Sequence, residues 1–125
     1  MKLSIIALSL IAGLSACDAY AAGHASAPAG QANGVLVDMN GMSLYTFDPD
    51  TATSSACNGG CAVSWPPLAA PADADATGGF TVITRDDGTK QWAHGGQPLY
   101  LWVNDSVPGD TTGDGVGGKW HLARP

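Results

Sequence analysis

The sequence contains no glutamate and little positive charge. Its 125 residues include 11 acidic residues, all of them aspartate, against 5 lysines and arginines, which gives a formal net charge of −6. Nucleic acids require a basic protein face, and anionic lipid surfaces attract basic segments. The composition therefore excludes nucleic acid as a partner and excludes membrane binding by charge alone.

Recognisable catalytic motifs are missing as well. No serine or cysteine lies in a nucleophile motif such as G-x-S-x-G, and none of the three histidines lies in an H-E-x-x-H pattern. The glycine-rich segments lack the lysine and the strand–helix setting of a phosphate-binding loop. A paired-carboxylate hydrolase would have to use two aspartates, and no such pair stands out. We therefore expect neither enzymatic activity nor a bound cofactor.

No apolar run is long enough to span a membrane. The longest, Leu3 to Leu14, has 12 residues, whereas a transmembrane helix needs about 20. Its position after Lys2 is typical of a secretory signal peptide. Leu14-Ser15-Ala16-Cys17 follows directly and resembles a bacterial lipobox, whose cysteine becomes the lipidated first residue. We favour this site over Ala19-Tyr20-Ala21, an ordinary signal-peptidase site that leaves soluble periplasmic or secreted protein as the alternative.

Cysteine is scarce, and its spacing indicates a disulfide. If Cys17 is acylated, only Cys57 and Cys61 remain of the three cysteines. A nearby pair in an exported chain is usually oxidised to a disulfide. Catalytic redox pairs have C-x-x-C spacing in a βαβ context, which is absent here, and a metal site would need two further ligands. A structural disulfide is therefore favoured over both.

Short strands separated by turns dominate after residue 33. Residues 17–33 are rich in Ala, Gly, Ser and Pro and are predicted to form a flexible tether after the lipidated cysteine. Asn40-Gly41 is predicted to form a type I′ hairpin turn, and Asp87-Gly88 and Gly95-Gly96 are further turns. One helical turn is expected over Cys61–Trp65. The predicted strands are Val35–Met39, Ser43–Phe47, Phe80–Thr84, Lys90–His94, Leu99–Val103 and Lys119–Ala123.

One stretch occurs twice, 55 residues apart. Gly41–Asp50 and Gly96–Asp105 share the pattern G-x-x-L-Y-x-[FW]-x-x-D, and the same offset carries Trp65 onto Trp120. Such self-similarity indicates an internal duplication. We therefore predict an all-β domain, a small antiparallel-sheet domain built from two tandem hairpin-containing repeats. It follows a signal peptide over residues 1–16 and spans residues 34–125, with copies at about 34–70 and 80–125.

The repeated residues are predicted to be mainly structural. A small domain must bury large rings to be stable, so a core is favoured over an aromatic ligand platform. Trp92 has no aromatic counterpart at Val37 and is the candidate for an exposed ring. Asp50 and Asp105 are expected to accept hydrogen bonds from nearby backbone amides and close turns. The repeated set is Tyr45, Phe47, Asp50, Trp65, Tyr100, Trp102, Asp105 and Trp120.

These motifs resemble a family of predicted bacterial lipoproteins with a Y-x-[FWY]-x-x-D motif, also described as a secreted repeat of unknown function. The resemblance covers nearly all of the chain from Gly34. It implies export, two repeats and a lipid anchor, and it implies no established activity. Beyond the repeated motif, it is carried by Cys57-x3-Cys61-Ala62-x-x-Trp65-Pro66-Pro67-Leu68, Asp87-Gly88, Gln91-Trp92, Pro108-Gly109-Asp110-Thr111 and Gly113-Asp114-Gly115.

Two groups of residues are candidate metal ligands. Asp110 and Asp114 open a stretch that resembles a calcium loop, D-x-[DN]-x-[DN]-G, but the position of the closing glutamate is occupied by His121. Met39, Met42, His94 and His121 combine the soft ligands that suit copper, and Met39 matches His94 at the repeat offset. For both groups the favoured interpretation is structural, as a glycine-rich turn and as residues that fill core gaps or lie on a sheet face.

The sequence therefore predicts an exported, lipid-anchored protein on the periplasmic side of a bacterial cell envelope. Its molecular activity is not specified, and a binding or structural module is favoured. The alternative is a periplasmic metal-binding (copper or calcium) or redox-accessory protein, and an enzyme of unrecognised type comes third. The membrane is contacted through the N-terminal lipid, and the protein or small-molecule partner is not identified.

Overall fold

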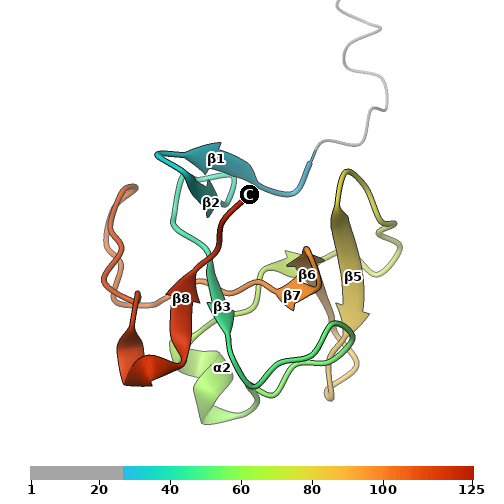
Figure 1. Ribbon diagram of the computed structural model, residues 1–125. Coiled ribbons are helices and arrows are strands. Elements are labelled where there is room, and N and C mark those ends of the chain that lie inside the picture. The colour runs from blue at the N-terminus through green and yellow to red at the C-terminus, as the bar shows by residue number, and fades with distance from the viewer. Residues whose placement is uncertain (1–26) are drawn as a thin grey trace, which may run out of the picture.

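The computed structural model describes residues 27–125. The signal peptide, the alternative cleavage sites and the lipidation residue Cys17 lie outside these residues. The described chain forms three small antiparallel sheets, with one five-residue helix and one short 3-10 turn (Figure 1). This confirms the predicted all-β class. Within residues 27–125, no helix is long and apolar enough to cross a membrane.

The first sheet begins earlier than the sequence predicted. Strand β1 (Gly30–Ala32) pairs with β2 (Val35–Val37) across a two-residue turn, Asn33-Gly34. Both turn residues have positive φ, 53° and 79°, as a type I′ hairpin requires. The predicted tether up to residue 33 and the domain start at residue 34 are therefore wrong. The residues of β1 (Gly-Gln-Ala) are small or polar and are exposed, so they show no apolar alternation in the sequence. Strand β2 holds them by backbone pairing.

The second Asn-Gly pair forms a different turn from the one predicted. Val37 bridges Ser43, so a hairpin is present, but at Asn40-Gly41 only the glycine has positive φ. The Asp38 carboxylate accepts the backbone amides of residues 40 and 42, both at 2.9 Å. This side chain stabilises the turn in place of the type I′ geometry.

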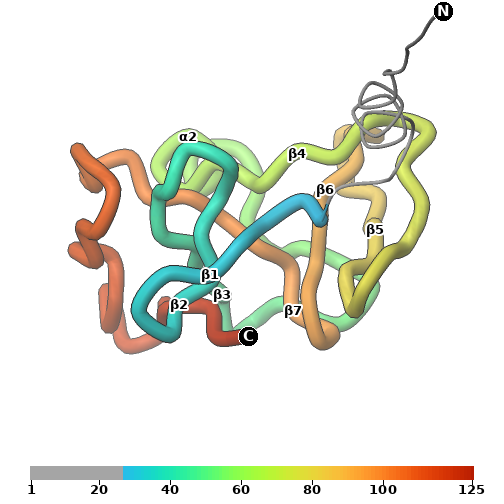
Figure 2. Tube along the Cα trace, turned by 90° about the horizontal axis from the view of Figure 1, so that it is seen from above, coloured from blue at the N-terminus to red at the C-terminus, as the bar shows by residue number. Residues whose placement is uncertain are grey.

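The second sheet has four strands and an open edge. Its order is β4 (Ala69–Ala70), β6 (Lys90–His94) and β5 (Phe80–Thr84), and β7 (Gln97–Pro98) also pairs with β6. The bounds of β5 and β6 agree with the prediction. Figures 1 and 2 both show this sheet at one side of the molecule, with the orange-red segment that precedes β8 at the opposite side. Among the strands of residues 27–125, β5 pairs only with β6, and its other edge faces outward apart from a bridge between Phe80 and Thr77.

The third sheet joins the two copies. Strand β3 (Tyr45–Phe47) of the first copy pairs with β8 (Trp120–Leu122) of the second, and Tyr45 lies opposite Leu122. At the positions 55 residues away, Tyr100 bridges Pro67. Each copy therefore supplies the strand that the other lacks, and the repeats are interleaved instead of lying side by side. Helix α2 (Gly60–Ser64) and turn η1 (Val116–Gly118) precede these crossing segments.

The segment Leu99–Val103 was predicted as a strand and is not a regular one. Its amides still bond to the first copy, with Leu101 N–H donating to Pro66 at 2.7 Å and Val103 N–H donating to Ser64 at 3.1 Å. The facing prolines cannot donate in return, which prevents a continuous ladder.

Two clusters of buried side chains form the core. One contains Leu36, Leu44, Phe80, Trp92, Leu99 and Ala123, and the other contains Tyr45, Cys57, Trp65, Tyr100 and Trp120. The expectation of an exposed Trp92 is wrong, since only 9 % of it is exposed. Trp92 N–H donates to Leu68, and the equivalent amide in the first copy belongs to Leu36. The first hairpin has one residue more than its counterpart in the second copy. The 55-residue offset therefore pairs Trp92 with Val37, whereas the hydrogen bonds show that its counterpart is Leu36.

Candidate functional site

The repeated tyrosine and aspartate form reciprocal pairs between the copies. The hydroxyl of Tyr45 donates to Asp105 Oδ2 at 2.7 Å, and the hydroxyl of Tyr100 donates to Asp50 Oδ2 at 2.6 Å. The two tyrosines also exchange backbone hydrogen bonds at 2.8 and 3.0 Å. Both rings are fully buried. The tyrosine of each motif therefore binds the aspartate of the other motif and holds the two repeats together. The sequence did not indicate this, because both residues occur within each single repeat.

Each motif aspartate also closes its own loop. Asp50 Oδ1 accepts the backbone amide of Ala56 at 2.7 Å. Asp105 Oδ1 accepts the amide and the hydroxyl of Thr112 at 2.9 and 2.6 Å. The sequence predicted the backbone contacts and missed the tyrosine partners.

Burial shifts the titration of these groups. Desolvation, followed by the hydrogen bond to Asp50, raises the pKa of Tyr100 to about 12. Desolvation and the bond to Asp105 also raise the pKa of Tyr45. Desolvation raises the pKa of Asp50, although the Ala56 amide, Tyr100 and Arg85 oppose that shift. Both tyrosines therefore remain neutral donors throughout the physiological pH range.

Four repeated rings form one continuous stack. The order is Phe47, Trp120, Trp65 and Trp102, with ring centroids 4.1, 3.7 and 3.9 Å apart. The central tryptophans lie within 2° of parallel, and each is only 5 % exposed. Tyr45 packs edge-on against Trp65 in one copy, as Tyr100 does against Trp120 in the other. The two central rings are covered on both faces and the two terminal rings, Phe47 and Trp102, are half-buried, so the stack is part of the core.

A buried arginine extends the Tyr100–Asp50 pair into a hydrogen-bond network. Arg85 is 5 % exposed, and its Nη1 donates to Ser55 Oγ at 2.9 Å and to Gln91 Oε1 at 2.8 Å. Its Nη2 donates to the carbonyl of Cys57 at 2.6 Å. Ser55 Oγ lies 2.6 Å from the hydroxyl of Tyr100. The chain of contacts therefore runs from the guanidinium through Ser55 and Tyr100 to the carboxylate of the motif.

The corresponding region of the second copy is closed by glycine. The amide of Gly113 donates to the Tyr45 hydroxyl at 3.2 Å. A Cβ atom at this glycine would lie 2.9 Å from ring atoms of Trp65 and of Tyr45. No side chain fits there, so the two copies share their tyrosine–aspartate pairs and differ in what surrounds them.

The predicted disulfide fastens the loop of the first copy. Cys57 and Cys61 are bonded, and the fully buried Cys57 packs in the aromatic cluster. The bond ties the loop to the first turn of α2. Earlier in the loop, Thr51 N–H donates to Ser54 O at 3.0 Å, and the hydroxyls of these residues lie 2.8 Å apart. Together with the Arg85 network, these contacts hold residues 50–58 in one position.

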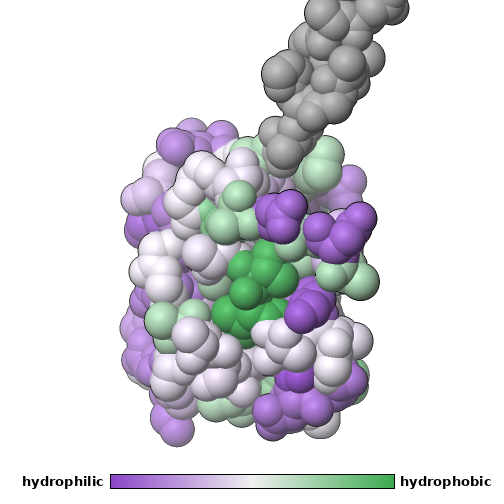
Figure 3. All heavy atoms as spheres, turned by 90° about the vertical axis from the view of Figure 1, so that its right-hand side faces the viewer, coloured by the Kyte–Doolittle hydropathy of each residue, from purple (hydrophilic) through white to green (hydrophobic). Residues whose placement is uncertain are grey.

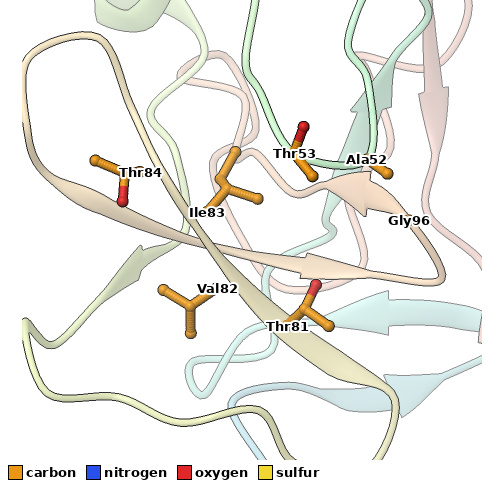
Figure 4. Close-up of a pocket in the computed structure, with 7 residues that line it drawn as sticks. All are labelled: Ala52, Thr53, Thr81, Val82, Ile83, Thr84 and Gly96. Atoms are coloured by element: carbon orange, nitrogen blue, oxygen red, sulfur yellow. The ribbon is translucent and has the colours of Figure 1, made fainter.

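The outer side of this loop forms one wall of a surface groove of about 430 Å³ along β5. The groove is uncharged and is lined by Ala52, Thr53, Thr81, Val82, Ile83, Thr84 and Gly96 (Figure 4). Figure 3 shows that the face of the molecule carrying β5 has one strongly apolar area set among hydrophilic residues. The sequence alone does not indicate this groove, because its wall and its floor come from segments that are far apart in the chain. Neither segment carries a residue pattern that indicates that the two lie together.

The structure disperses the candidate copper ligands. Met39 is 81 % exposed, and the ring of His94 in β6 packs against Phe80 at 4.7 Å. His121 lies in β8, in a different sheet, and its Nε2 is 3.0 Å from Asp48 Oδ2. Met42 lies beyond the first-copy turn and is half-buried. Because that hairpin has the extra residue, Met39 and His94 do not occupy equivalent positions.

The candidate calcium ligands are bonded to backbone amides. Asp110 Oδ2 accepts the amides of Ser106 and Val107 at 2.8 and 3.2 Å. Asp114 Oδ1 accepts the amide of Leu122 at 3.1 Å. In the part of the chain from residue 27 onward, no group of three or more His, Cys, Asp or Glu is arranged to hold a metal ion.

Comparison with known proteins gives one family and locates both copies. A family model described as a secreted repeat of unknown function matches the chain twice, at residues 29–69 and 81–124. No curated protein matches the chain, and no solved structure matches it. The two matched segments correspond to the two interleaved repeats.

Proposed function

The chain belongs to the family of secreted repeats of unknown function, and on that premise we propose that it is a lipid-anchored binding module of the bacterial cell envelope. Its ligand occupies the groove along β5. The module faces the periplasm, is held to the membrane through an acylated Cys17 and catalyses no reaction. Export itself follows from membership in a secreted family.

The observation that carries the binding proposal is the way in which the groove wall is held. Ala52 and Thr53 line the groove and belong to the loop that Asp50, Tyr100 and Arg85 fasten from inside. A site whose walls are already ordered loses less conformational entropy when a ligand binds. The equivalent loop of the second copy packs onto Tyr45 through Gly113 instead. The tyrosine–aspartate pairs have the same geometry in both copies, which supports a structural role for them. The loops differ between the copies, which supports a binding role for the loop of the first copy alone.

The anchor is supported by the lipobox-like residues that end at Cys17. The test is an intact mass spectrum of protein extracted from the envelope of its own host, compared with a Cys17→Ser variant. We expect a chain that begins at Cys17, carries acyl groups and partitions into detergent, and a variant that stays in the aqueous phase. An unacylated chain that begins at Ala22 would contradict the anchor. A copper or calcium ion retained in the native mass and lost on chelation would instead favour the metal-binding alternative.

The binding role is tested by photo-crosslinking in intact cells. A photoreactive amino acid replaces Thr53 at the groove wall, and the same residue replaces Thr111 as the control. Both threonines are exposed and lie in loops of the two different copies. We expect a reproducible adduct from position 53 and at least tenfold less from position 111. No adduct, or equal adducts from both positions, would contradict a ligand in the groove.

A further inference from the structure

We propose that the occupant of the groove is an extended, uncharged or basic polypeptide segment of another protein, which adds to the edge of β5 as a further strand. This inference names the ligand class for the groove and therefore rests on the proposed binding function. It depends on the direction of the backbone groups of β5, on what already covers one end of the strand, and on the charge of the chain.

The register of the sheet shows which backbone groups of β5 point outward. Val82 lies opposite Trp92 in β6. Trp92 uses its amide on Leu68 and its carbonyl on Leu99, both on the side away from β5. Val82 and Trp92 are therefore a non-hydrogen-bonded pair, and the amide and carbonyl of Val82 point away from β6. Thr84, two residues further on, has the same orientation.

Only part of this edge is open. The outward amide and carbonyl of Phe80 exchange hydrogen bonds with Thr77 at 2.8 and 2.9 Å, so a turn covers the start of the strand. The amides and carbonyls of Val82 and Thr84 have no backbone partner among residues 27–125. A row of unpaired backbone groups is a template for another strand. Because Val82 and Thr84 also line the groove, a segment bound there meets both apolar surface and free backbone groups.

The chemistry of the groove and the chain selects the kind of segment. All the residues that line the groove are uncharged, so burying a charged side chain among them would cost solvation energy. The whole chain has a formal net charge of −6, which repels acidic segments at long range and attracts basic ones. Strand addition then gives affinity through the backbone, and the groove accepts the small or β-branched side chains of the added strand.

A second copy of this chain fits the edge poorly. A two-fold pairing of β5 with itself about Val82 would set Thr84 opposite Phe80 of the other copy. The outward groups of Phe80 are already bonded to Thr77. Two copies of an acidic chain also repel each other. The partner is therefore a different polypeptide.

The experiment uses the 15N-labelled chain with Cys17→Ser and a defined probe, the blocked hexapeptide acetyl-KTVTVT-amide. We expect binding to slow hydrogen exchange at the amides of Val82 and Thr84 at least tenfold, with little change at Thr111. The acidic analogue acetyl-DTVTVT-amide should bind at least threefold more weakly. Two further peptides are N-methylated, one at the odd-numbered residues and the other at the even-numbered residues. In an added strand only every second backbone amide faces β5, so the peptide that has lost those amides should bind at least tenfold more weakly.

A proline variant tests the same edge from the side of the protein. Val82→Pro removes an outward amide and leaves the ladder to β6 intact, as proline permits only at a sheet edge. We expect Trp92 to keep its native chemical shift and peptide affinity to fall at least tenfold. If the variant fails to fold, the N-methylated peptides still test whether the backbone of β5 binds the peptide, because they are used with the wild-type strand.

Four results would overturn the inference. One is unchanged exchange at Val82 and Thr84 with millimolar peptide. Another is equal binding by both N-methylated peptides. The third is protection of these two amides without peptide that disappears when residues 18–26 are deleted, since the segment preceding the described residues would then occupy the edge. A glycan or lipid adduct at position 53 would likewise overturn the polypeptide ligand while upholding the binding function.

Discussion

The hydroxyl of Tyr100 donates a 2.6 Å hydrogen bond to the carboxylate of Asp50, and this bond joins the second repeat to the first. Its counterpart joins Tyr45 to Asp105 at 2.7 Å. The two bonds are equivalent in geometry and differ in surroundings, because only the first continues through Ser55 to a buried arginine. The difference gives the motif two roles, which variants can separate.

Removing either hydroxyl should destabilise the fold by a similar amount. Tyr100→Phe and Tyr45→Phe each leave a buried or half-buried carboxylate without one donor, which typically costs about 1–3 kcal/mol. Urea unfolding measures the free energy directly. Hydrogen exchange should then distinguish the variants, with faster exchange at Ala56 in Tyr100→Phe alone. An exposed Thr111→Val control should change stability by less than about 0.5 kcal/mol, and a Tyr100→Phe variant as stable as that control would refute the structural role of the bond.

The four-ring stack predicts unequal costs along its length. Trp65→Leu removes a central, 5 % exposed ring that touches both neighbours. We expect a loss of about 3 kcal/mol in the free energy of unfolding. Trp102→Leu removes the half-buried terminal ring and should cost roughly half as much. Equal losses in a thermal or urea melt would contradict the stacking order.

The glycine that closes the second copy should not tolerate a methyl group. Gly113→Ala places a Cβ atom 2.9 Å from ring atoms of Trp65 and Tyr45, and overpacking of this kind costs about 1–3 kcal/mol. Gly60→Ala is the matched control, because its Cβ would meet nothing within 4 Å. We expect the control to be neutral or slightly stabilised, since alanine favours the helix. If both variants melt at the wild-type temperature, the close packing at Gly113 is wrong.

The stability of the protein should depend on the charge of Asp50. Its pKa is raised in the folded state, chiefly by burial, so the folded chain binds this proton more tightly than the unfolded chain does. The contribution to stability is complete below the unfolded pKa, about 3.9, and is lost as the pH rises through the folded value. Asp50→Asn cannot ionise and should remove that loss. The stability of wild type relative to this variant should therefore decrease between about pH 4 and neutrality. In urea titrations, a constant difference would show that the pKa of Asp50 is not shifted, and an increasing difference would show that the shift has the opposite sign.

The residue composition of short segments predicted several of the strands. It did not predict which strands of the two copies pair with each other. Phe80–Thr84 and Lys90–His94 have β-branched and aromatic residues between glycine turns, and the structure reproduces their bounds. The strand Gly30–Ala32 has no such composition and is formed only because β2 pairs with it. Nothing local to Tyr45 says that it bonds with Tyr100, because strand composition does not specify which strand lies alongside.

The candidate site was harder to predict than the fold for two physical reasons. Arginine is rarely buried, so a sequence gives no reason to place Arg85 among Ser55, Gln91 and Cys57. The groove needs residues 52–53 to lie beside β5, which depends on the disulfide and on the bond between copies together. The motif and the disulfide were visible in the sequence, and their joint effect on the loop was not.

The most direct test combines the motif with the groove. Photo-crosslinking from position 53 is repeated in intact cells with Tyr100→Phe and, separately, with Tyr45→Phe. Since only Tyr100 holds the loop that forms the groove wall, we expect the adduct to fall at least fivefold in Tyr100→Phe and to persist in Tyr45→Phe. Equal loss in both variants, or no loss in either, would contradict the claim that one repeat of the motif holds a binding site.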